Sequence, residues 1–474
     1  MEREAESTAV LGKSDHTSAL QEALRYPLVD ALTNRRSRRF SLGATLPGGA
    51  LAYKSKRAPL PLTTSEEAAL AFAAAGINGF ALGDLPFQEG NLPEGGGGNV
   101  IATLTGRTGA SADAVHSTAL FVINDSGTYL LKRPQDFTLD EIKMLARLAE
   151  DHKLEQVYEK MRIKIRDGRT VIEKKVPLTF PFNKWSTNLA GSTYFLPVCE
   201  LTSMYINVLL STFDEQMAMF LLDERAKFQP AGIKRFGKSQ GGRLHDNPDD
   251  SRVASILAIE TIIVEFMLAE QAFMVHNLSL MEQAMGLGGW THFASAQETT
   301  WFEVLGFKIG SQRLSQIMNA GPLRRFILRL KGADRSYPHP LGLTLNGVDL
   351  IKPFCPPYYR SMEEAVLAFR NTSKQASLGR HCASTSPAPG RIRQPCRRAF
   401  RSSATSASPQ RSRTAPMCTR RTGNSPPISA RCARRSRIRH IIWTSISTTS
   451  SIIPAPTPRP RRATTIAGTA RGSA

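Results

Sequence analysis

The stretch that decides the fold class is ALFVINDSGTYLL, residues 119–131. Two runs rich in aliphatic and aromatic residues flank the turn-forming sequence Asn124-Asp125-Ser126-Gly127. This pattern is typical of a β-hairpin. A second alternation, which begins at Ile163 and passes through Asp167-Gly168 to Val171, predicts another hairpin with a tight turn.

Helical patterns surround these hairpins. Residues 20–32 predict a short helix, and residues 212–222 predict another. Capping boxes predict helix starts at Thr64-Ser65-Glu66-Glu67, before an Ala-rich helix, and at Thr138 with Glu141. Ser251 is the predicted cap of a long apolar helix to about Met285. Helices and hairpins mixed in this way, without a regular βαβ series, indicate an α+β fold with a mixed sheet flanked by helices.

Charge is unevenly distributed along the 474 residues, whose formal net charge is +21. Residues 370–474 contain 21 Lys and Arg and no Asp or Glu, whereas residues 1–369 hold 40 basic and 40 acidic residues. The neutral body is long enough for one large or two modest domains. A dedicated nucleic-acid binder would instead carry its positive charge on the folded domain.

The N-terminal sequence, the most apolar run and the cysteine content indicate the cellular compartment of the protein. The acidic N-terminal residues show no signal peptide. The most apolar run, residues 256–268, contains Glu260 and Glu265 and is too short to span a bilayer. The body has only Cys199 and Cys355, without metal-ligand spacing. We therefore expect a cytoplasmic protein with no membrane partner and no metal site.

The basic tail has two interpretations. A Ser-, Arg- and Pro-rich segment can be a disordered tail that contacts nucleic acid. Alternatively, residues 370–474 are coding sequence read out of frame. Back-translation of residues 440–454, started two bases later, permits HHLDFDFYDKFYHP, and the same offset permits ADVYETYGKFPAYF over residues 415–429. The constant offset favours a frameshift, which predicts a disordered tail without strand pairing.

Two motifs concern phosphate. Residues 232–239, GIKRFGKS, match the P-loop pattern. A P-loop needs a buried strand before it and a helix after it, and neither flank has that character, so we expect a loop there. Residues 34–40, NRRSRRF, fit either a solvated basic face or a phosphate clamp, because guanidinium and hydroxyl groups match phosphate oxygens. Trp185 and Trp290 could wall a pocket or lie in the core.

Four segments carry a further pattern in chain order. They are Arg35-Arg36-Ser37-x-Arg39, the helical TTSEEAALAFAAAG at residues 63–76, RTGASADA at residues 107–114 before a strand, and HNLSLM followed by AMGLGG, which ends at residue 289. Together they resemble the nitroreductase family of FMN-dependent oxidoreductases. The second segment resembles especially its azoline-oxidase branch of peptide-modifying dehydrogenases.

The resemblance implies an α+β sandwich that forms an intertwined homodimer with FMN at the interface. By position, Arg35 and Ser37 would hold the FMN phosphate, with Arg38 outside this clamp. Arg39 would lie near the N1/O2 edge of the flavin and stabilise its anionic reduced ring.

The same resemblance implies further cofactor-binding residues. Ser111, Ala112 and Asp113 would line the pyrimidine side of the flavin, and Ala294 lies in the loop that would donate a backbone N–H to flavin N5. Hydride would pass from NAD(P)H through FMN to a small-molecule or peptide acceptor of nitro, quinone or azoline type. No catalytic side chain is assigned, since the flavin carries the chemistry.

Two other functional classes stay open at this point. One is a catalytically inactive flavin-fold protein that acts as a binding or scaffold protein. The other is a nucleic-acid-associated protein, if the basic tail is genuine. The expected organisation is an N-terminal segment (1–24), an FMN-binding domain (25–310), a C-terminal extension without an assigned role (311–369) and the basic tail (370–474).

Overall fold

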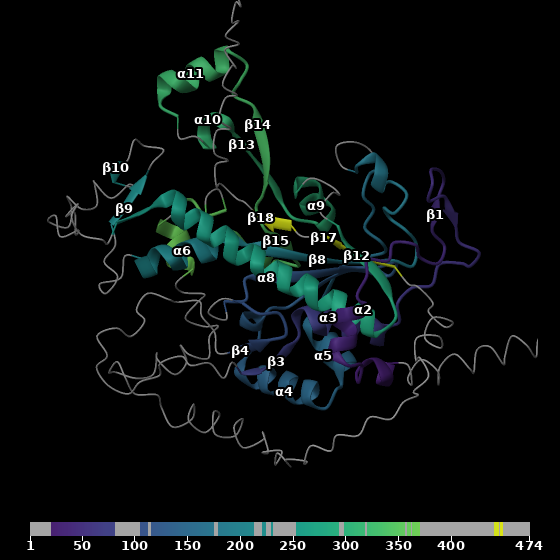
Figure 1. Ribbon diagram of the computed structural model, residues 1–474. Coiled ribbons are helices and arrows are strands. Elements are labelled where there is room, and N and C mark those ends of the chain that lie inside the picture. Colours follow the sequence, from purple (N-terminus) through teal and green to yellow (C-terminus); the bar gives the residue numbers. More distant parts are fainter. Residues whose placement is uncertain are drawn as a thin grey trace, which may run out of the picture. The chain divides into compact units, whose positions relative to one another are not determined.

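The computed structural model describes most of the body and two short segments of the tail (Figure 1). The chain forms two compact units, a larger one within Met1–Gly310 and Pro338–Ser450 and a smaller one within Ser311–Tyr337 and Ser451–Ala474. We describe each unit by itself. The described residues are 20–80, 105–111, 115–174, 179–212, 220–223, 229–230, 253–292, 298–317, 320–355, 358–361, 363–369, 440–444 and 446–448.

A seven-stranded mixed sheet forms the centre of the larger unit. Its strand order is β12-β17-β8-β5-β6-β7, and β18 also pairs with β8. The pairs from β8 to β7 are antiparallel, whereas β12, β17 and β8 run parallel. The bounds are β5 Thr118–Ile123, β6 Gly127–Leu131, β7 Arg162–Asp167, β8 Thr193–Glu200, β12 Gly288–His292, β17 His440–Thr444 and β18 Ile446–Thr448. With its helices, this sheet confirms the α+β class.

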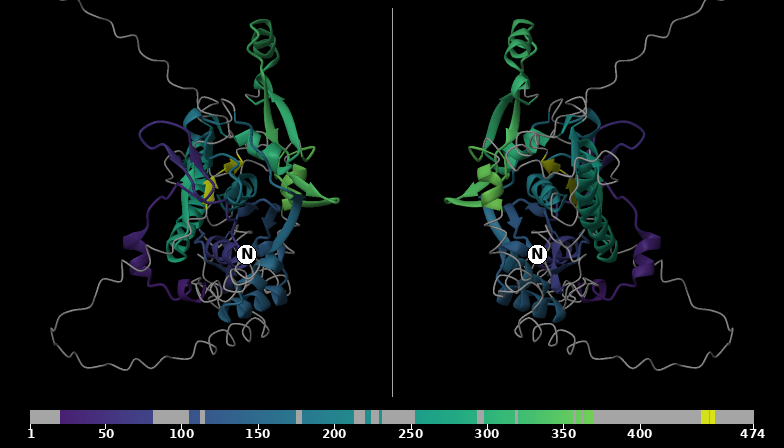
Figure 2. Two further views of the ribbon diagram at one scale, coloured as in Figure 1. Left: turned by 90° about the vertical axis from the view of Figure 1, so that its right-hand side faces the viewer. Right: turned by 90° about the vertical axis from the view of Figure 1, so that its left-hand side faces the viewer.

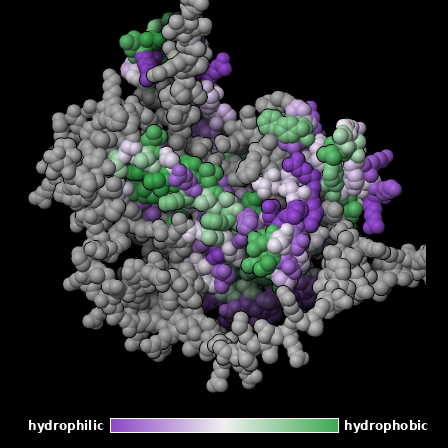
Figure 3. Space-filling model, viewed as in Figure 1, coloured by the Kyte–Doolittle hydropathy of each residue, from purple (hydrophilic) through white to green (hydrophobic). Residues whose placement is uncertain are grey.

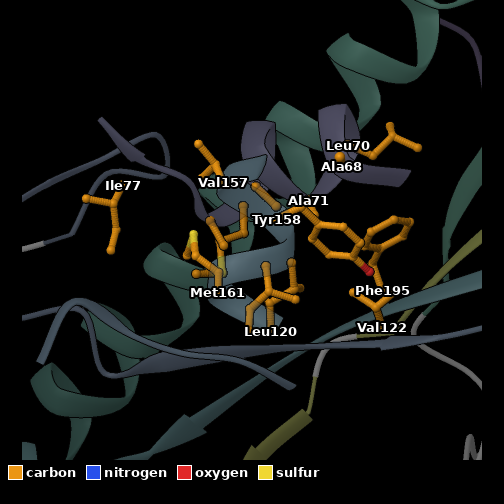
Figure 4. Close-up of a cluster of buried hydrophobic side chains, with 14 of the residues drawn as sticks. Ala68, Leu70, Ala71, Ile77, Leu120, Val122, Val157, Tyr158, Met161 and Phe195 are labelled. Atoms are coloured by element: carbon orange, nitrogen blue, oxygen red, sulfur yellow. The ribbon is translucent and has the colours of Figure 1, made fainter. Parts of the chain in front are cut away.

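Both faces of the sheet are covered, because successive side chains of a strand point to opposite faces. Leu120 and Val122 of β5 belong to a core with α3 (Thr64–Ala75), α5 (Leu154–Met161) and α8 (Ile256–Ala284). Figure 4 shows these two side chains and Phe195 of β8 directed toward α3 and α5. Phe121 and Ile123 face a second core with α9 (Glu298–Leu305).

The long helix α8 packs on α3 and on β8 and crosses one face of the sheet (Figures 1 and 2). The other elements of the larger unit are α2 (Leu28–Asn34), β1 (Thr45–Leu46), β2 (Tyr53–Lys54), β3 (Ile77–Phe80), β4 (Thr105–Arg107), η2 (Pro134–Asp136), α4 (Leu139–Glu150), η3 (Pro181–Asn183), α6 (Leu201–Thr212), β9 (Phe220–Asp223), β10 (Gln229–Pro230), β11 (Val253–Ser255), β15 (Leu343–Leu345) and β16 (Val348–Ile351).

Two sequence predictions about the sheet meet different outcomes. The hairpin over residues 119–131 is confirmed, with Ile123 opposite Thr128. The predicted hairpin around Asp167-Gly168 is wrong, because β7 pairs back with β6 and Val171 is exposed. The free edge of β6 offers a full row of backbone partners to β7, and Gly168, with φ +70°, turns the chain away from the sheet.

The capping boxes are nearly as predicted. Thr138 and Glu141 cap α4 reciprocally. For α3 the cap is Thr63, one residue before the predicted Thr64, and it exchanges hydrogen bonds with Glu66. The cap of α8 is Ser255 rather than Ser251, and its Oγ accepts the N–H of Ala258 at 2.9 Å. Residue 251 lies outside the described residues.

The two remaining helix predictions are wrong in extent. The helix expected over residues 20–32 is interrupted before Pro27, which lacks an N–H, and α2 starts after it. Of the helix expected over residues 212–222, only Thr212 is helical among the described residues, as the last residue of α6, and residues 213–219 lie outside the described residues. The expected end of this helix falls in β9, which pairs with β11.

The tail prediction also needs correction. The prediction of a disordered tail without strand pairing is wrong for two segments of the tail. Strand β17 lies between β12 and β8, and β18 pairs with β8. The physical reason is local composition. Residues 440–448 (HIIWTSIST) are rich in β-branched and aromatic residues, which favour a strand irrespective of the arginines that precede them.

Candidate functional site

A cavity of about 1180 Å³ lies in the larger unit, between residues 37–51 and residues 174–189. It lies beside the edge strand β12, to which the first of these segments is tied. The cavity is lined by Ser37, Arg38, Arg39, Phe40, Gly43, Thr45, Leu46, Pro47, Gly48, Leu51, Lys174, Pro181, Phe182, Lys184, Trp185 and Leu189.

Arg38 anchors the first wall of this cavity. Its backbone N–H donates to the carbonyl of Gly289 at 2.9 Å, and its guanidinium donates to the carbonyl of Leu287 at 3.2 Å. Both acceptors lie where α8 ends and β12 begins. The coil after α2 is therefore fixed against the edge of the sheet by a residue that sequence reasoning left outside the phosphate clamp.

A buried carboxyl lies behind this anchor. Glu282, near the end of α8, accepts a hydrogen bond from the backbone N–H of Gly289. Burial raises the pKa of Glu282 to about 8, although the charge of Arg38, the Gly289 hydrogen bond and the charge of Arg35 oppose the rise. Arg38 thus lies within electrostatic range of a carboxyl whose pKa is close to neutral.

Aromatic rings form a column along the cavity wall. Phe40 contacts Tyr53 at 5.1 Å between ring centroids and stacks on Trp185 at 5.9 Å. Trp185 in turn stacks on Trp290 at 6.4 Å with an interplanar angle of 13°. The guanidinium of Arg39 lies 5.9 Å from the Trp290 centroid. Such a surface favours a flat ring system.

The cavity lining carries positive charge without compensation. Arg38, Arg39, Lys174 and Lys184 line it, together with the hydroxyl-bearing Ser37, and no Asp or Glu is among the lining residues. Guanidinium, ammonium and hydroxyl groups donate hydrogen bonds to phosphate oxygens. Cations beside stacked rings suit an aromatic ligand that bears a phosphate.

The structure brings together two of the residues that the sequence predicts for cofactor binding. Ser37 and Arg39 both line the cavity. Arg35 is exposed at the C-terminal end of α2 and is not among the lining residues. Ala112, Asp113 and Ala294 lie outside the described residues, as do residues 232–239.

Ser111 belongs to a different environment, a buried polar cluster between α8 and the sheet. Its Oγ accepts the N–H of His116 at 2.9 Å. Arg107 donates to the carbonyl of Thr118 at 2.8 Å, and Glu270 of α8 accepts the N–H of Thr118 at 2.9 Å. Burial lowers the pKa of Arg107 to about 10 and that of His116 to about 4. We assign this cluster to the anchoring of α8.

Sequence reasoning missed several lining residues. Lys174, Phe182 and Lys184 were not predicted, and Trp185 was only one of several aromatic candidates. The signal for Phe182, Lys184 and Trp185 is the run TFPFNKW at residues 179–185, where exposed aromatic rings and a lysine alternate. Lys174 lies outside this run. Phe182 is 66% exposed and stacks on Phe180 at 5.6 Å. Only the folded chain brings this run opposite residues 37–51.

Comparisons with known proteins return no family model, no curated protein and no solved structure that matches this chain. We therefore argue function from the residues of the site. Within the described ranges, no three His, Cys, Asp or Glu side chains gather as a metal site. Among the helices that the structure describes, none has the length and apolar character needed to cross a membrane.

Proposed function

We propose that this protein is a cytoplasmic FMN-dependent oxidoreductase of the nitroreductase type. It takes hydride from NAD(P)H and delivers it to an organic acceptor of nitro, quinone or azoline type. One observation carries the proposal: a carboxylate-free cationic cavity beside stacked aromatic rings contains Ser37 and Arg39. The bound FMN supplies the hydride chemistry, and the chain binds and orients it.

The lining residues fit the two chemical parts of FMN. Ser37, Lys174 and Lys184 offer donors to a phosphate, and the side chains of Phe40 and Trp185 offer apolar surface to a ring. Arg39 is exposed, and it forms no ion pair within the described part of the chain, so its charge is available to a ligand. The cavity is larger than the roughly 300–1,000 Å³ of most small-molecule sites, which leaves room for an acceptor beside the cofactor.

Titration of the full chain with FMN tests whether the chain binds this cofactor. Quenching of flavin fluorescence measures the binding. Each lost charge-assisted contact should cost about 1.5–3 kcal/mol, or roughly one to two decades in Kd. We expect this loss for Arg39→Ala and for Lys184→Ala. Arg36→Ala is the matched control, because Arg36 is exposed, lies outside the cavity and, among the described residues, donates to the carbonyls of Thr33 and Arg35.

The outcomes separate the open alternatives. A chain that takes up no FMN, or variants that bind it equally well, would remove the flavin assignment. A chain that binds FMN in this cavity but consumes no NADH or NADPH with any acceptor would be the non-catalytic binding protein. Arg38→Ala is unsuitable as a control because it also removes the anchor to Leu287.

The proposed enzyme is a homodimer. The exposed face of α8 supports this dimer. Eleven positions of α8 are exposed, and Glu265 is the only one that is charged when histidine is neutral. Leu257 is 50% exposed and Phe273 48%. Figure 3 shows hydrophobic side chains gathered along α8. Contiguous apolar surface of this kind is typical of an interface.

The exposed face of α8 is also self-complementary. If two copies pair antiparallel about a two-fold axis between residues 270 and 271, Glu265 lies level with His276 of the second copy. Ala269 then lies level with Ala272, and Leu268 with Phe273. The small residues permit close approach, and an acid and a base meet at each end. We infer that a second copy covers α8 in this register.

A further inference from the structure

We propose that helix α11 (Pro322–Leu330) docks this protein on membrane surfaces rich in anionic lipid. The helix belongs to the smaller unit, together with α10 (Leu314–Ile317). In sequence, both helices lie between the paired strands β13 (Ile309–Arg313) and β14 (Ser336–Pro340), of which residues 311–313 and 336–337 belong to this unit. The inference is independent of the cavity and of the proposed flavin chemistry.

Four apolar residues of α11 lie on one helical face and are exposed, whereas Leu328 lies off this face and is partly buried. The four recur at positions i, i+3, i+4 and i+7, the spacing of one side of an α-helix. Such a face normally packs on a core, and α11 has no buried residue. The exposed fractions are 73% for Leu323, 62% for Phe326, 41% for Ile327 and 76% for Leu330.

Cations flank this apolar face. Residues 321–331 contain three arginines and a lysine and no acidic residue. Arg324 and Lys331 form no ion pair within the residues that the structure describes. Asp334, the nearest acidic residue, is buried and accepts hydrogen bonds from Ser315 and Arg329. In Figure 3, green and purple side chains adjoin at α11.

The charge pattern indicates which kind of partner covers the apolar face of α11. A second copy of α11 would bring Arg324 and Lys331 close to the same cations, and like charges repel. A short apolar stripe between basic side chains matches the boundary of an anionic bilayer, where the apolar side chains enter the acyl region and the cations meet the headgroups. Such a helix lies on the membrane and does not span it. A search of the sequence for a membrane-spanning apolar run, such as the one made at residues 256–268, therefore does not find it.

Co-sedimentation of the full chain with vesicles tests the proposal. We use phosphatidylcholine vesicles with and without about one third phosphatidylserine. The basic tail adds electrostatic binding of its own, so the decisive variant keeps every charge: Leu323→Ser, Phe326→Ser and Leu330→Ser together. We expect the bound fraction on anionic vesicles to fall several-fold. Val171→Ser with Val348→Ser removes exposed apolar groups elsewhere and should change nothing.

Hydrogen exchange of residues 322–330 provides the second readout. Anionic vesicles should slow exchange there in the wild-type chain and leave it unchanged in the triple serine variant. Equal sedimentation of the two chains, or exchange in α11 that vesicles do not alter, would overturn the proposal and assign all vesicle binding to the tail. Protection of residues 322–330 by an acidic protein but not by vesicles would also overturn it.

Discussion

Glu282 is a buried carboxyl through which pH should act on the stability of this protein. Its pKa is raised to about 8 in the folded chain, from an ordinary value of 4.5, because the carboxyl is buried. The folded state therefore holds a proton that the unfolded state releases. The contribution of Glu282 to the free energy of unfolding should be largest below about pH 4.5 and fall as pH rises to about 8, by at most about 1.4 kcal/mol per pH unit.

Urea unfolding between pH 5 and pH 8 measures this slope. Glu282→Gln keeps the acceptor for the Gly289 N–H without the titrating proton, so its free energy of unfolding should vary less with pH. Glu303→Gln alters an exposed carboxyl on α9 and should keep the wild-type slope. Parallel pH profiles for wild type and Glu282→Gln would contradict the assignment.

At the same scale, residue types predicted the site in part. On donor chemistry alone the cluster of residues 35–39 fitted either a phosphate clamp or a solvated basic face, and Ser37 and Arg39 line a cationic cavity. Residue types could not predict that Arg35 lies outside the cavity or that Ser111 lies in a different, buried cluster. They depend on the end of α2 and on the buried cluster around Arg107.

At the scale of the element, α8 is the segment whose outer face should determine oligomeric state. Glu265→Lys removes the carboxylate that lies level with His276 of the second copy, and His276→Glu places two carboxylates opposite each other. His276→Glu should weaken self-association tenfold or more, because juxtaposed like charges cost several kcal/mol, and Glu265→Lys should weaken it less. Glu265→Lys with His276→Glu restores opposite charges and should restore the dimer. Sedimentation velocity measures the dissociation constant.

The outcome for the double variant is the discriminating one. If both single variants dissociate and the double variant also stays monomeric, α8 lies in an interface with another register. If all the variants dimerise like wild type, a different surface joins the copies. Lys143→Glu on α4 is the control for a change of surface charge away from α8, since Lys143 contacts only Asp140 among the ion pairs of the described residues.

At the scale of the whole molecule, the tail strand β17 should contribute to stability. It pairs with β12 on one side and with β8 on the other. A chain that ends after Phe369 would leave both strands with unpaired edges, so we expect a melting temperature lower by roughly 5 °C or more and a tendency to aggregate. Circular dichroism during heating measures this.

Ile442→Pro in the full chain is the matched variant, because proline cannot donate to the sheet. It should reproduce most of the loss. Identical melting of the full chain, the shortened chain and Ile442→Pro would show that the tail adds nothing to the sheet. Sequencing of the DNA around the codon for Phe369 distinguishes a frameshift from a genuine tail.

By itself the sequence determined the α+β class, the hairpin over residues 119–131, the helix starts near Thr63 and Thr138, and the long apolar helix α8. These features depend on turns, caps and periodicity, which act between residues a few positions apart. Only the tertiary structure decided that β7 pairs with β6, that β17 enters the sheet, and that residues 37–51 meet residues 174–189 around one cavity. Those contacts join segments far apart in the chain, and no local preference specifies which partner a segment meets.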